Sequence, residues 1–309
     1  MAKRKRKNAK RQSLITALVV LVIAAGSFCY SYFMQNPSPG TEGVSQPQES
    51  EQLQVYFIDV GQGDSSLIVC GEHSVLIDAG EAEYANDVIR QIQDLGISRL
   101  DCIVSTHPHS DHAGGLPYVI ETIGADMILM PALTEENIPT TRTYEALMAA
   151  VASSDAAVEN PAPGDVYRFG DIVFTIYSPV FAEDSELNNM SIVFRLVYGN
   201  RSFLFTGDAE KEVEEELLND GVILQSDVIK MPHHGSKTSS TDDFVAAVSP
   251  QYAIVSCGDG GKNHPNEDIV LRWQTIGTTV LRTDYAGTVI VTTDGESLTV
   301  QTEKTGAVS

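Results

Sequence analysis

Four potential metal ligands fall within six residues of this chain, in the segment His107-Pro108-His109-Ser110-Asp111-His112. Imidazole nitrogen and carboxylate oxygen suit Zn²⁺, and also Mn²⁺ or Fe²⁺. The run before the segment, residues 100–105, is typical of a short buried strand, and Gly114-Gly115 after it indicates a turn into a helix. The segment therefore occupies a loop at a strand end, where a rigid scaffold directs several side chains at one point. The alternative is a solvated histidine-rich turn without metal, but a surface turn has no need of this spacing.

Two other motifs accompany this segment: residues 57–64, Phe-Ile-Asp-Val-Gly-Gln-Gly-Asp, and residues 233–236, His-His-Gly-Ser. With the histidine segment they resemble the metallo-β-lactamase superfamily, and within it the metallo-hydrolase domain of ComEC-type DNA-uptake proteins. The likeness covers residues 53–302. It implies an α/β fold, the four-layer αββα sandwich, in which helices flank two central sheets and the metals lie at one edge between the sheets.

The pattern of apolar runs and turn residues supports an α/β architecture without the resemblance. Hairpins are predicted around Gly170-Asp171 and Gly199-Asn200, and helices alternate with other strands. The predicted helices cover residues 85–95, 140–152, 209–219, 241–248 and 266–275. The predicted strands cover residues 55–60, 66–70, 74–77, 100–105, 127–130, 166–169, 172–178, 191–198, 201–206, 228–231, 252–256, 280–282, 287–292 and 297–302.

The beginning of the chain differs in character from the rest. Residues 1–12 are strongly basic, and residues 13–34 are uncharged and rich in Leu, Val, Ile and Ala. We expect residues 13–34 to form a transmembrane helix, because about 20 helical residues span the roughly 30 Å hydrocarbon core of a bilayer. The positive-inside rule then places residues 1–12 in the cytoplasm and the catalytic domain outside the cell, as a single-pass protein of the cell membrane. A cleaved signal peptide is the alternative.

The predicted anchor is followed by a linker and an acidic body. Residues 35–52 are rich in Pro, Gly, Ser, Gln and Glu and lack a hydrophobic pattern, which predicts a flexible linker. Residues 53–302 then form the hydrolase domain, and residues 303–309 form a tail. The formal net charge is −22, and the seven Lys and Arg of residues 1–11 leave −29 for the remainder. Such a body repels polyanions and argues against tight, charge-driven binding of nucleic acid, although a merely solvated acidic surface is the default interpretation.

The resemblance implies two metal sites that share Asp208, an aspartate at the end of a predicted strand. We expect one or two divalent ions, Zn²⁺ in the first place and Mn²⁺ as the alternative. The alternative role for Asp208 is that of N-cap of the helix 209–219, but its position after a strand and Gly207 favours the metal-bridging role. The expected ligands are His107, His109 and Asp208 for the first site, and Asp111, His112, Asp208 and one of His233 and His234 for the second.

One segment departs from the superfamily pattern. Many members place a metal-binding histidine in the region between residues 181 and 191, where this chain has Asn188-Asn189, as ComEC-type domains also have Asn. The first site would then be completed by water or by the weak oxygen ligand of Asn188. We therefore expect the first site to bind its ion more weakly than the second.

Three further residues are candidates for contact with substrate. The sequence does not decide between His233 and His234; we favour His234 as the ligand and His233 as the substrate-facing group, a proton donor or phosphate contact. Lys237, in the loop 235–240, supplies a cation beside hydroxyl and backbone N–H groups, with a solvated Ser-rich loop as the alternative. His264 either contacts substrate or serves as the last metal ligand, and a capping role is its alternative.

Two aspartates are expected to assist the reaction. Asp111 ligates a metal or orients the attacking water. Asp64 supports the histidine loop from the second layer around the metals, or is a simple turn residue.

These residues together predict a hydrolase. A bound divalent ion lowers the pKa of its water to about 7 and so makes hydroxide available at neutral pH. We expect a metal-bound hydroxide to attack a phosphoester, foremost a phosphodiester and, through the resemblance, DNA. The alternatives are a β-lactamase- or lactone-type hydrolase and a non-catalytic module that assists DNA uptake. The expected partners are a phosphoester, with nucleic acid as one candidate, and the membrane; protein partners are unknown.

Overall fold

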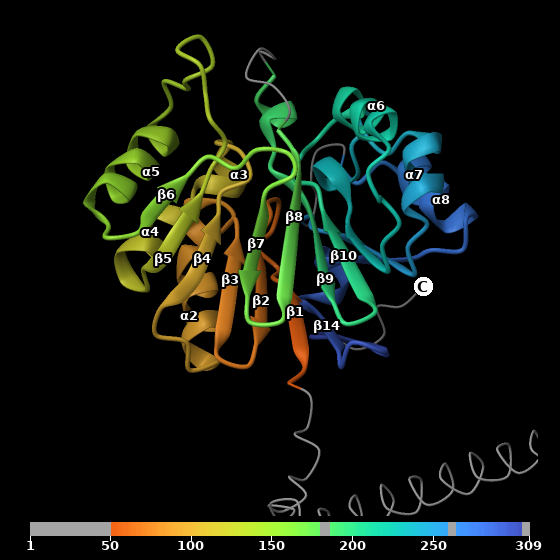
Figure 1. Cartoon of the computed structure of the whole chain (residues 1–309), viewed down its shortest axis with the longest axis horizontal. Coiled ribbons are helices and arrows are strands. Elements are labelled where there is room, and N and C mark those ends of the chain that lie inside the picture. The colour runs from red at the N-terminus through yellow and green to blue at the C-terminus, as the bar shows by residue number, and fades with distance from the viewer. Residues whose placement is uncertain (1–50, 180–185, 259–263, 305–309) are drawn as a thin grey trace, which may run out of the picture. The chain divides into compact units, whose positions relative to one another are not determined.

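Two β-sheets lie face to face, and helices cover the outer face of each sheet (Figure 1). The computed structural model describes residues 51–179, 186–258 and 264–304. The predicted tip and anchor, residues 1–34, and nearly all of the predicted linker lie outside the described residues. Among the described helices, none has both the length and the apolar character needed to cross a membrane.

The first sheet has eight strands in the order β15-β14-β1-β2-β3-β4-β5-β6. Strands β3 to β6 pair in parallel, whereas the remaining neighbours are antiparallel. The strands are β1 (Leu53–Phe57), β2 (Ser66–Cys70), β3 (His73–Ile77), β4 (Leu100–Val104), β5 (Ala125–Leu129), β6 (Ala157–Glu159), β14 (Val289–Thr293) and β15 (Leu298–Thr302).

The second sheet has seven strands in the order β13-β12-β11-β10-β9-β8-β7, and β10 to β13 are parallel. The strands are β7 (Val166–Phe169), β8 (Ile172–Ser178), β9 (Val193–Tyr198), β10 (Arg201–Phe205), β11 (Val228–Lys230), β12 (Tyr252–Val255) and β13 (Thr279–Arg282). Because parallel neighbours end at the same side, each sheet gathers several carboxyl-terminal strand ends along one edge.

The core between the sheets is apolar and aromatic. Phe57 of the first sheet stacks on Phe205 of the second with ring centroids 6.0 Å apart. The rings continue through Phe194 to Phe174, at 5.0 Å and 4.9 Å. All four side chains are buried, and such aromatic contacts add to the large area that each ring removes from water.

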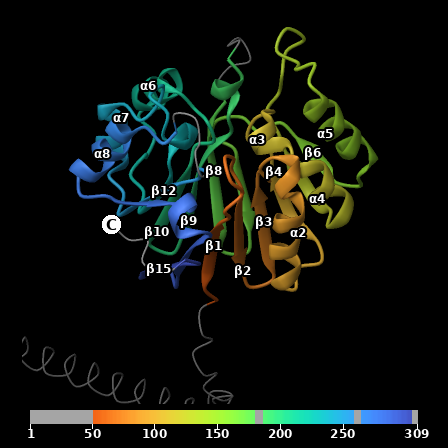
Figure 2. The same ribbon diagram turned by 180° about the vertical axis from the view of Figure 1, so that it is seen from behind.

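Two further apolar clusters join the helices to the outer faces of the sheets. Figures 1 and 2 show α2, α4 and α5 over the first sheet and α6, α7 and α8 over the second. The predicted four-layer αββα sandwich is thereby confirmed. The longer helices are α2 (Ala85–Asp94), α4 (Leu116–Thr122), α5 (Arg142–Ser153), α6 (Lys211–Asp220), α7 (Asp242–Val248) and α8 (Glu267–Thr275); the shorter ones are η1 (Ala82–Tyr84), α3 (Ser110–Ala113), η2 (Leu187–Met190), η3 (Pro232–Gly235) and α9 (Thr283–Ala286).

The capping role considered for Asp208 is wrong. Helix α6 begins at Lys211 rather than at residue 209, and Glu210 occupies the N-cap position. Asp208 instead lies in the turn between β10 and the helix, where its side chain is free to face the other sheet. Strand β6 and helix α9 were not predicted, since three or four residues carry too short a pattern to recognise.

Candidate metal centre

The predicted ligands come from strand ends on both sheets. Strand β4 leads into the histidine segment, and α3, which carries its last residues, lies at the upper ends of β3 and β4 in Figure 1. Strand β10 leads to Asp208, and β11 leads to His233 and His234. The facing edges of the two sheets therefore bring residues about 100 positions apart in sequence to one place.

Special backbone conformations bring these loops close together. Gly207 has φ +50°, and a Cβ there would lie 2.8 Å from Ser191 Oγ and 3.1 Å from Thr106 Cβ, so only glycine permits this approach. His233 and His234 both have positive φ, 45° and 51°, which is costly for residues with a side chain. His233 Nε2 and His234 Nε2 lie 3.8 Å and 3.6 Å from Asp208 Oδ2, and backbone strain of this kind is common at functional sites.

Four predicted ligands form a tight cluster. One donor atom from each of Asp111, His112, Asp208 and His234 lies within 4.8 Å of all the others. His112 Nε2 is 3.1 Å from Asp208 Oδ1 and 3.2 Å from His234 Nε2. His234 Nε2 is 3.4 Å from Asp111 Oδ2 and 3.6 Å from Asp208 Oδ2. Two nitrogens and two carboxylates in this arrangement are a donor set for Zn²⁺ or a similar ion.

Hydrogen bonds from Nδ1 of His112 and His234 determine which nitrogen of each neutral ring carries the lone pair. His234 Nδ1 donates to the carbonyl oxygen of Ser256 at 2.8 Å, since a carbonyl only accepts. His112 Nδ1 donates to the Asp78 carboxylate, also at 2.8 Å. In the neutral form each ring has its single N–H on Nδ1, so its Nε2 carries the lone pair that can bind a metal ion. Such a site favours a cation, and ligating histidines are usually held in this manner.

The electrostatics of the cluster also favour a cation. Burial works against a charged His112, yet the carboxylates of Asp208 and Asp78 outweigh it and raise the pKa of His112 well above its ordinary value. Burial likewise opposes ionisation of Asp208, but His112 and His234 hold its pKa well below the usual range. The field that attracts a second proton to His112 also attracts a metal ion, which would bind the neutral ring in place of that proton.

Asp208 gives a direct test of whether an ion fits. Its Oδ1 atom is buried and has no hydrogen bond among the described residues, although His112 Nε2 is only 3.1 Å away. A buried carboxylate oxygen without a hydrogen bond is rare and costly. The residues present therefore fit a divalent ion held by Asp111, His112, Asp208 and His234.

His107 and His109 lie beside this cluster but are less closely gathered. His107 Nε2 is 3.1 Å from His109 Nδ1 and 3.9 Å from Asp208 Oδ2. Neither histidine belongs to the ligand clusters found among residues 51–179, 186–258 and 264–304. Burial lowers the pKa of His107 well below its ordinary value and so keeps the ring neutral, the form that ligates metal.

Asn188 lies in helix η2, in the segment where many superfamily members carry a histidine. Its Nδ2 group donates to Glu210 Oε1 at 3.0 Å. Its Oδ1 atom is buried and makes no hydrogen bond within the described part of the chain, so a ligand oxygen is available there.

The predicted substrate-facing residues lie around the rim. His233 is partly exposed, with Nε2 3.8 Å from Asp208 Oδ2. The His264 ring lies 5.4 Å from that of His233, centroid to centroid, and its Nδ1 atom is buried without a hydrogen bond to any described residue. Lys237 is exposed on the following loop. His234 therefore lies inside the cluster, and His233, His264 and Lys237 lie outside it.

Sequence reasoning missed most of the residues behind the ligands. Asp78 accepts hydrogen bonds from Thr106 N and Thr106 Oγ1, at 2.8 and 2.6 Å, besides binding His112. Asp64, considered as a support of the histidine loop, accepts from Ser256 Oγ at 2.9 Å, and its backbone N–H donates to Asp111 O. The sequence feature that could have identified Asp78 is its position at a strand end, directly before Ala79-Gly80.

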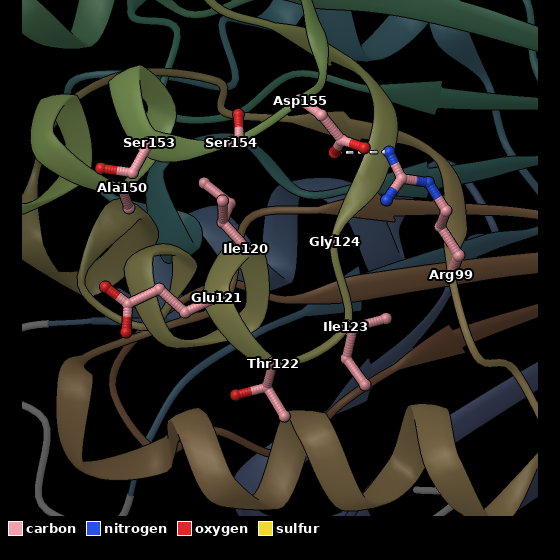
Figure 3. A pocket seen from close by; sticks show the side chains of 10 residues that line it. All are labelled: Arg99, Ile120, Glu121, Thr122, Ile123, Gly124, Ala150, Ser153, Ser154 and Asp155. Atoms are coloured by element: carbon pink, nitrogen blue, oxygen red, sulfur yellow. Dashed lines mark hydrogen bonds and ion pairs between the residues drawn. The ribbon is translucent and has the colours of Figure 1, made fainter.

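Of two surface hollows, one has a proposed metal ligand in its wall and the other has none. One, of about 610 Å³, includes Asp111 in its wall together with Glu81, Glu83 and Tyr84. The other, of about 440 Å³, lies between α4 and α5, and Figure 3 shows Arg99 pointing to Asp155 at its rim. Arg99 is bound there by Asp155 and Asp126, at 2.8 and 2.6 Å. Arg99 of the second hollow is thus already paired with carboxylates, whereas the first hollow adjoins the metal centre.

Known proteins with similar sequences are longer than this chain. The chain is 31% identical over 263 residues to ComE operon protein 3 of Bacillus subtilis, covering 79% of this chain and 33% of that protein. It is 31% identical over 232 residues to competence protein ComA of Neisseria gonorrhoeae, covering 74% and 30%. The chain thus spans about a third of these relatives. The expected resemblance to ComEC-type metallo-hydrolase domains is confirmed.

Solved structures agree on the fold alone. A CmlA β-hydroxylase variant superposes with a TM-score of 0.52 at 14% identity, covering 80% of this chain and 54% of that one. The family model for the metallo-beta-lactamase superfamily matches residues 58–259, a segment that includes the histidine motif, Asp208 and His234. With the αββα sandwich and the ligand cluster between its sheets, the chain belongs to the metallo-beta-lactamase superfamily.

Proposed function

We propose that this protein is a membrane-anchored, extracytoplasmic, metal-dependent hydrolase of phosphodiesters. The observation that carries the proposal is the convergence of Asp111, His112, Asp208 and His234 on one point, with Asp208 Oδ1 buried and without a hydrogen bond among described residues. An ion held there supplies a water of lowered pKa and positive charge for a developing oxyanion. Substrate binding and proton exchange are then carried out by side chains of this protein.

The residues at the rim suit an anionic substrate. Lys237 lies four residues after His233 in the same loop and is exposed. A phosphodiester oxygen that enters beside the cluster meets this cation. His233, whose Nε2 atom faces Asp208, is placed to exchange a proton with substrate or to contact its phosphate.

The competence relatives make DNA one candidate substrate. The net charge of −22 repels a long polyanion from the surface outside the site, so we expect nucleic acid to contact the protein only at the site. A small phosphodiester avoids that repulsion. A β-lactam or lactone hydrolase is the weaker candidate, because Lys237 offers nothing specific to a neutral ring. The third candidate, a non-catalytic module that assists DNA uptake, has no need of the buried donor set.

Purified residues 51–309 give a decisive assay. Zn²⁺ and Mn²⁺ content is measured first, and hydrolysis of bis-p-nitrophenyl phosphate is then compared with hydrolysis of a β-lactam and a neutral lactone. We expect bound metal and turnover of the diester. Turnover of the neutral substrates alone supports the second candidate, and bound metal without any turnover supports the third.

The proposed anchor is tested separately. Residues 13–34 are uncharged and apolar, and residues 1–12 are basic. If residues 1–12 lie in the cytoplasm, protease added to intact, wall-permeable cells should cut within residues 35–52 and release the catalytic domain. Protection of that domain until the membrane is ruptured would place it on the cytoplasmic side and refute the proposed topology.

A further inference from the structure

Glu210 binds the histidine that lies just outside the metal cluster. It occupies the N-cap of α6, two residues after Asp208. Its Oε1 atom is 3.2 Å from His233 Nδ1, and the two side chains are only 18% and 19% exposed. No motif in the sequence marks this residue, which is one of many acidic residues around α6.

The hydrogen bonds around Glu210 determine where His233 carries its hydrogen. Thr238 Oγ1 donates its single hydrogen to Glu210 Oε1 at 3.0 Å, because a carboxylate only accepts. The same Thr238 oxygen is 3.0 Å from His233 Nδ1 and must therefore accept from it. In the neutral ring the hydrogen thus resides on Nδ1, and Nε2 is left with a lone pair that faces Asp208.

Glu210 is itself held by the segments on both sides of the site. Asn188 Nδ2 donates to its Oε1 atom, and its backbone N–H donates to Asn189 Oδ1, both at 3.0 Å. The next backbone N–H, of Lys211, donates to the Thr238 carbonyl at 2.9 Å. The first turn of α6 also favours a carboxylate through the helix dipole. A single carboxylate consequently joins η2, α6 and the His233 loop.

We propose that Glu210, together with Thr238, is a positioning residue that fixes the tautomer and direction of His233. The inference deepens the proposed function, on which the substrate-facing role of His233 rests. In this arrangement Glu210 does not touch substrate. It acts through His233, whose Nε2 atom it keeps available to the reaction beside Asp208.

The tautomer is measured without any turnover. Nitrogen-15 NMR of the Zn²⁺-loaded protein distinguishes protonated from unprotonated ring nitrogens, and His233→Gln assigns the signals. We expect Nδ1 of His233 to be protonated in the native protein and the two tautomers to mix in Glu210→Gln. Glu215→Gln removes the same charge from an exposed position of α6 and should leave the signals unchanged. Thr238→Val replaces Glu210→Gln if the latter fails to fold.

The kinetic arm asks whether Glu210 acts through His233. We expect Glu210→Gln to lower kcat for bis-p-nitrophenyl phosphate about 10- to 100-fold, with metal content retained and KM changed by less than about twofold. In a His233→Gln background the same substitution should have little further effect, since the two residues act as one unit. Thr238→Val should behave like Glu210→Gln.

The outcomes separate this inference from the proposed function. If the native protein cleaves no phosphodiester, the proposed function fails, and the nitrogen signals alone decide the role of Glu210. An unchanged His233 tautomer in both Glu210→Gln and Thr238→Val overturns the positioning role. So does a loss from Glu210→Gln that is equally large with and without His233, because a merely structural contact would act in that manner.

Discussion

Lys230 Nζ lies 2.7 Å from Asp64 Oδ2, and the two side chains are only 2% and 5% exposed. Asp64 also accepts a hydrogen bond from Ser256 Oγ, and the carbonyl of Ser256 accepts one from His234 Nδ1. A buried ion pair thus lies two contacts behind a proposed metal ligand. Burial opposes the charge on Asp64, yet Lys230 and the nearby histidines hold the pKa of Asp64 below its usual value.

We expect Lys230→Met to destabilise the protein by about 3–5 kcal/mol, because it leaves the Asp64 carboxylate buried and unpaired. Unfolding in denaturant measures this change. Lys211→Met is the matched control, since Lys211 is 60% exposed and its pair with Glu212 is 3.7 Å long. Adding Asp64→Leu to Lys230→Met should recover part of the loss. A Lys230→Met protein as stable as the control would mean that Asp64 is not charged when buried.

Asp208 is the proposed ligand common to both metal sites. Asp208→Ala removes both of its oxygens, so we expect lower occupancy at both sites, measured by elemental analysis after dialysis against trace Zn²⁺. Asp208→Asn keeps the size of the side chain and should also lose metal, since its charge is gone. Full metal content in both variants would show that Asp208 is not a ligand.

His234 and His233 should fail in different ways. His234→Gln removes a member of the cluster and should reduce bound metal, and activity with it. His233→Gln should retain metal but lower kcat by roughly 10²–10⁴-fold, the usual scale for acid–base assistance. Metal content and turnover are measured on the same samples. The reverse pattern, with metal lost from His233→Gln alone, would exchange the two roles.

Glu214 gives the fold a pH dependence that is independent of the metal. Burial raises its pKa from 4.5 to about 7, against the effect of hydrogen bonds from the backbone N–H groups of Thr241 and Ser240. Between these two pH values the folded protein binds more protons than the unfolded chain, so the free energy of unfolding falls as pH rises.

The corresponding experiment compares unfolding in denaturant at pH 5 and pH 7.5. The loss attributable to Glu214 should be on the order of 2–3 kcal/mol and should be absent in Glu214→Gln. Glu215→Gln, which removes an exposed carboxylate from the same helix, should retain the native slope. If Glu214→Gln also retains it, another group is responsible.

The sequence revealed those parts of the site whose residues are contiguous. Asp111 and His112 share one loop and both lie in the cluster, as their spacing predicted, whereas His107 and His109 of the same loop lie beside it. The partner of His112 was not visible, because Asp78 reaches it only through the parallel pairing of β3 with β4. Glu210 likewise became recognisable only when β10 and β11 placed residues 210 and 233 side by side.

The α/β architecture was predicted from apolar runs and turn residues, and the four layers were implied by the family resemblance; neither source defines element ends well. The helix was predicted to start at residue 209, and capping by Asp208 was the alternative to its role as a ligand. In the structure Asp208 faces His112 and His234 instead, and the helix begins two residues later. A local preference was overridden by long-range electrostatic contacts, which the sequence pattern does not contain.

The substitution Lys237→Ala tests whether the residues around the metal centre favour a negatively charged substrate. Removing its ammonium group in Lys237→Ala should raise KM for bis-p-nitrophenyl phosphate with kcat little changed, because the lost attraction acts on the bound substrate and the transition state alike. The effect should shrink as salt rises, since the side chain is exposed. Lys304→Ala, which removes a half-exposed lysine bound to Asp59, is the control for general charge and should leave KM unchanged. An enzyme that cleaves a neutral lactone or β-lactam well, ignores the diester and is indifferent to Lys237→Ala would overturn the phosphodiester assignment.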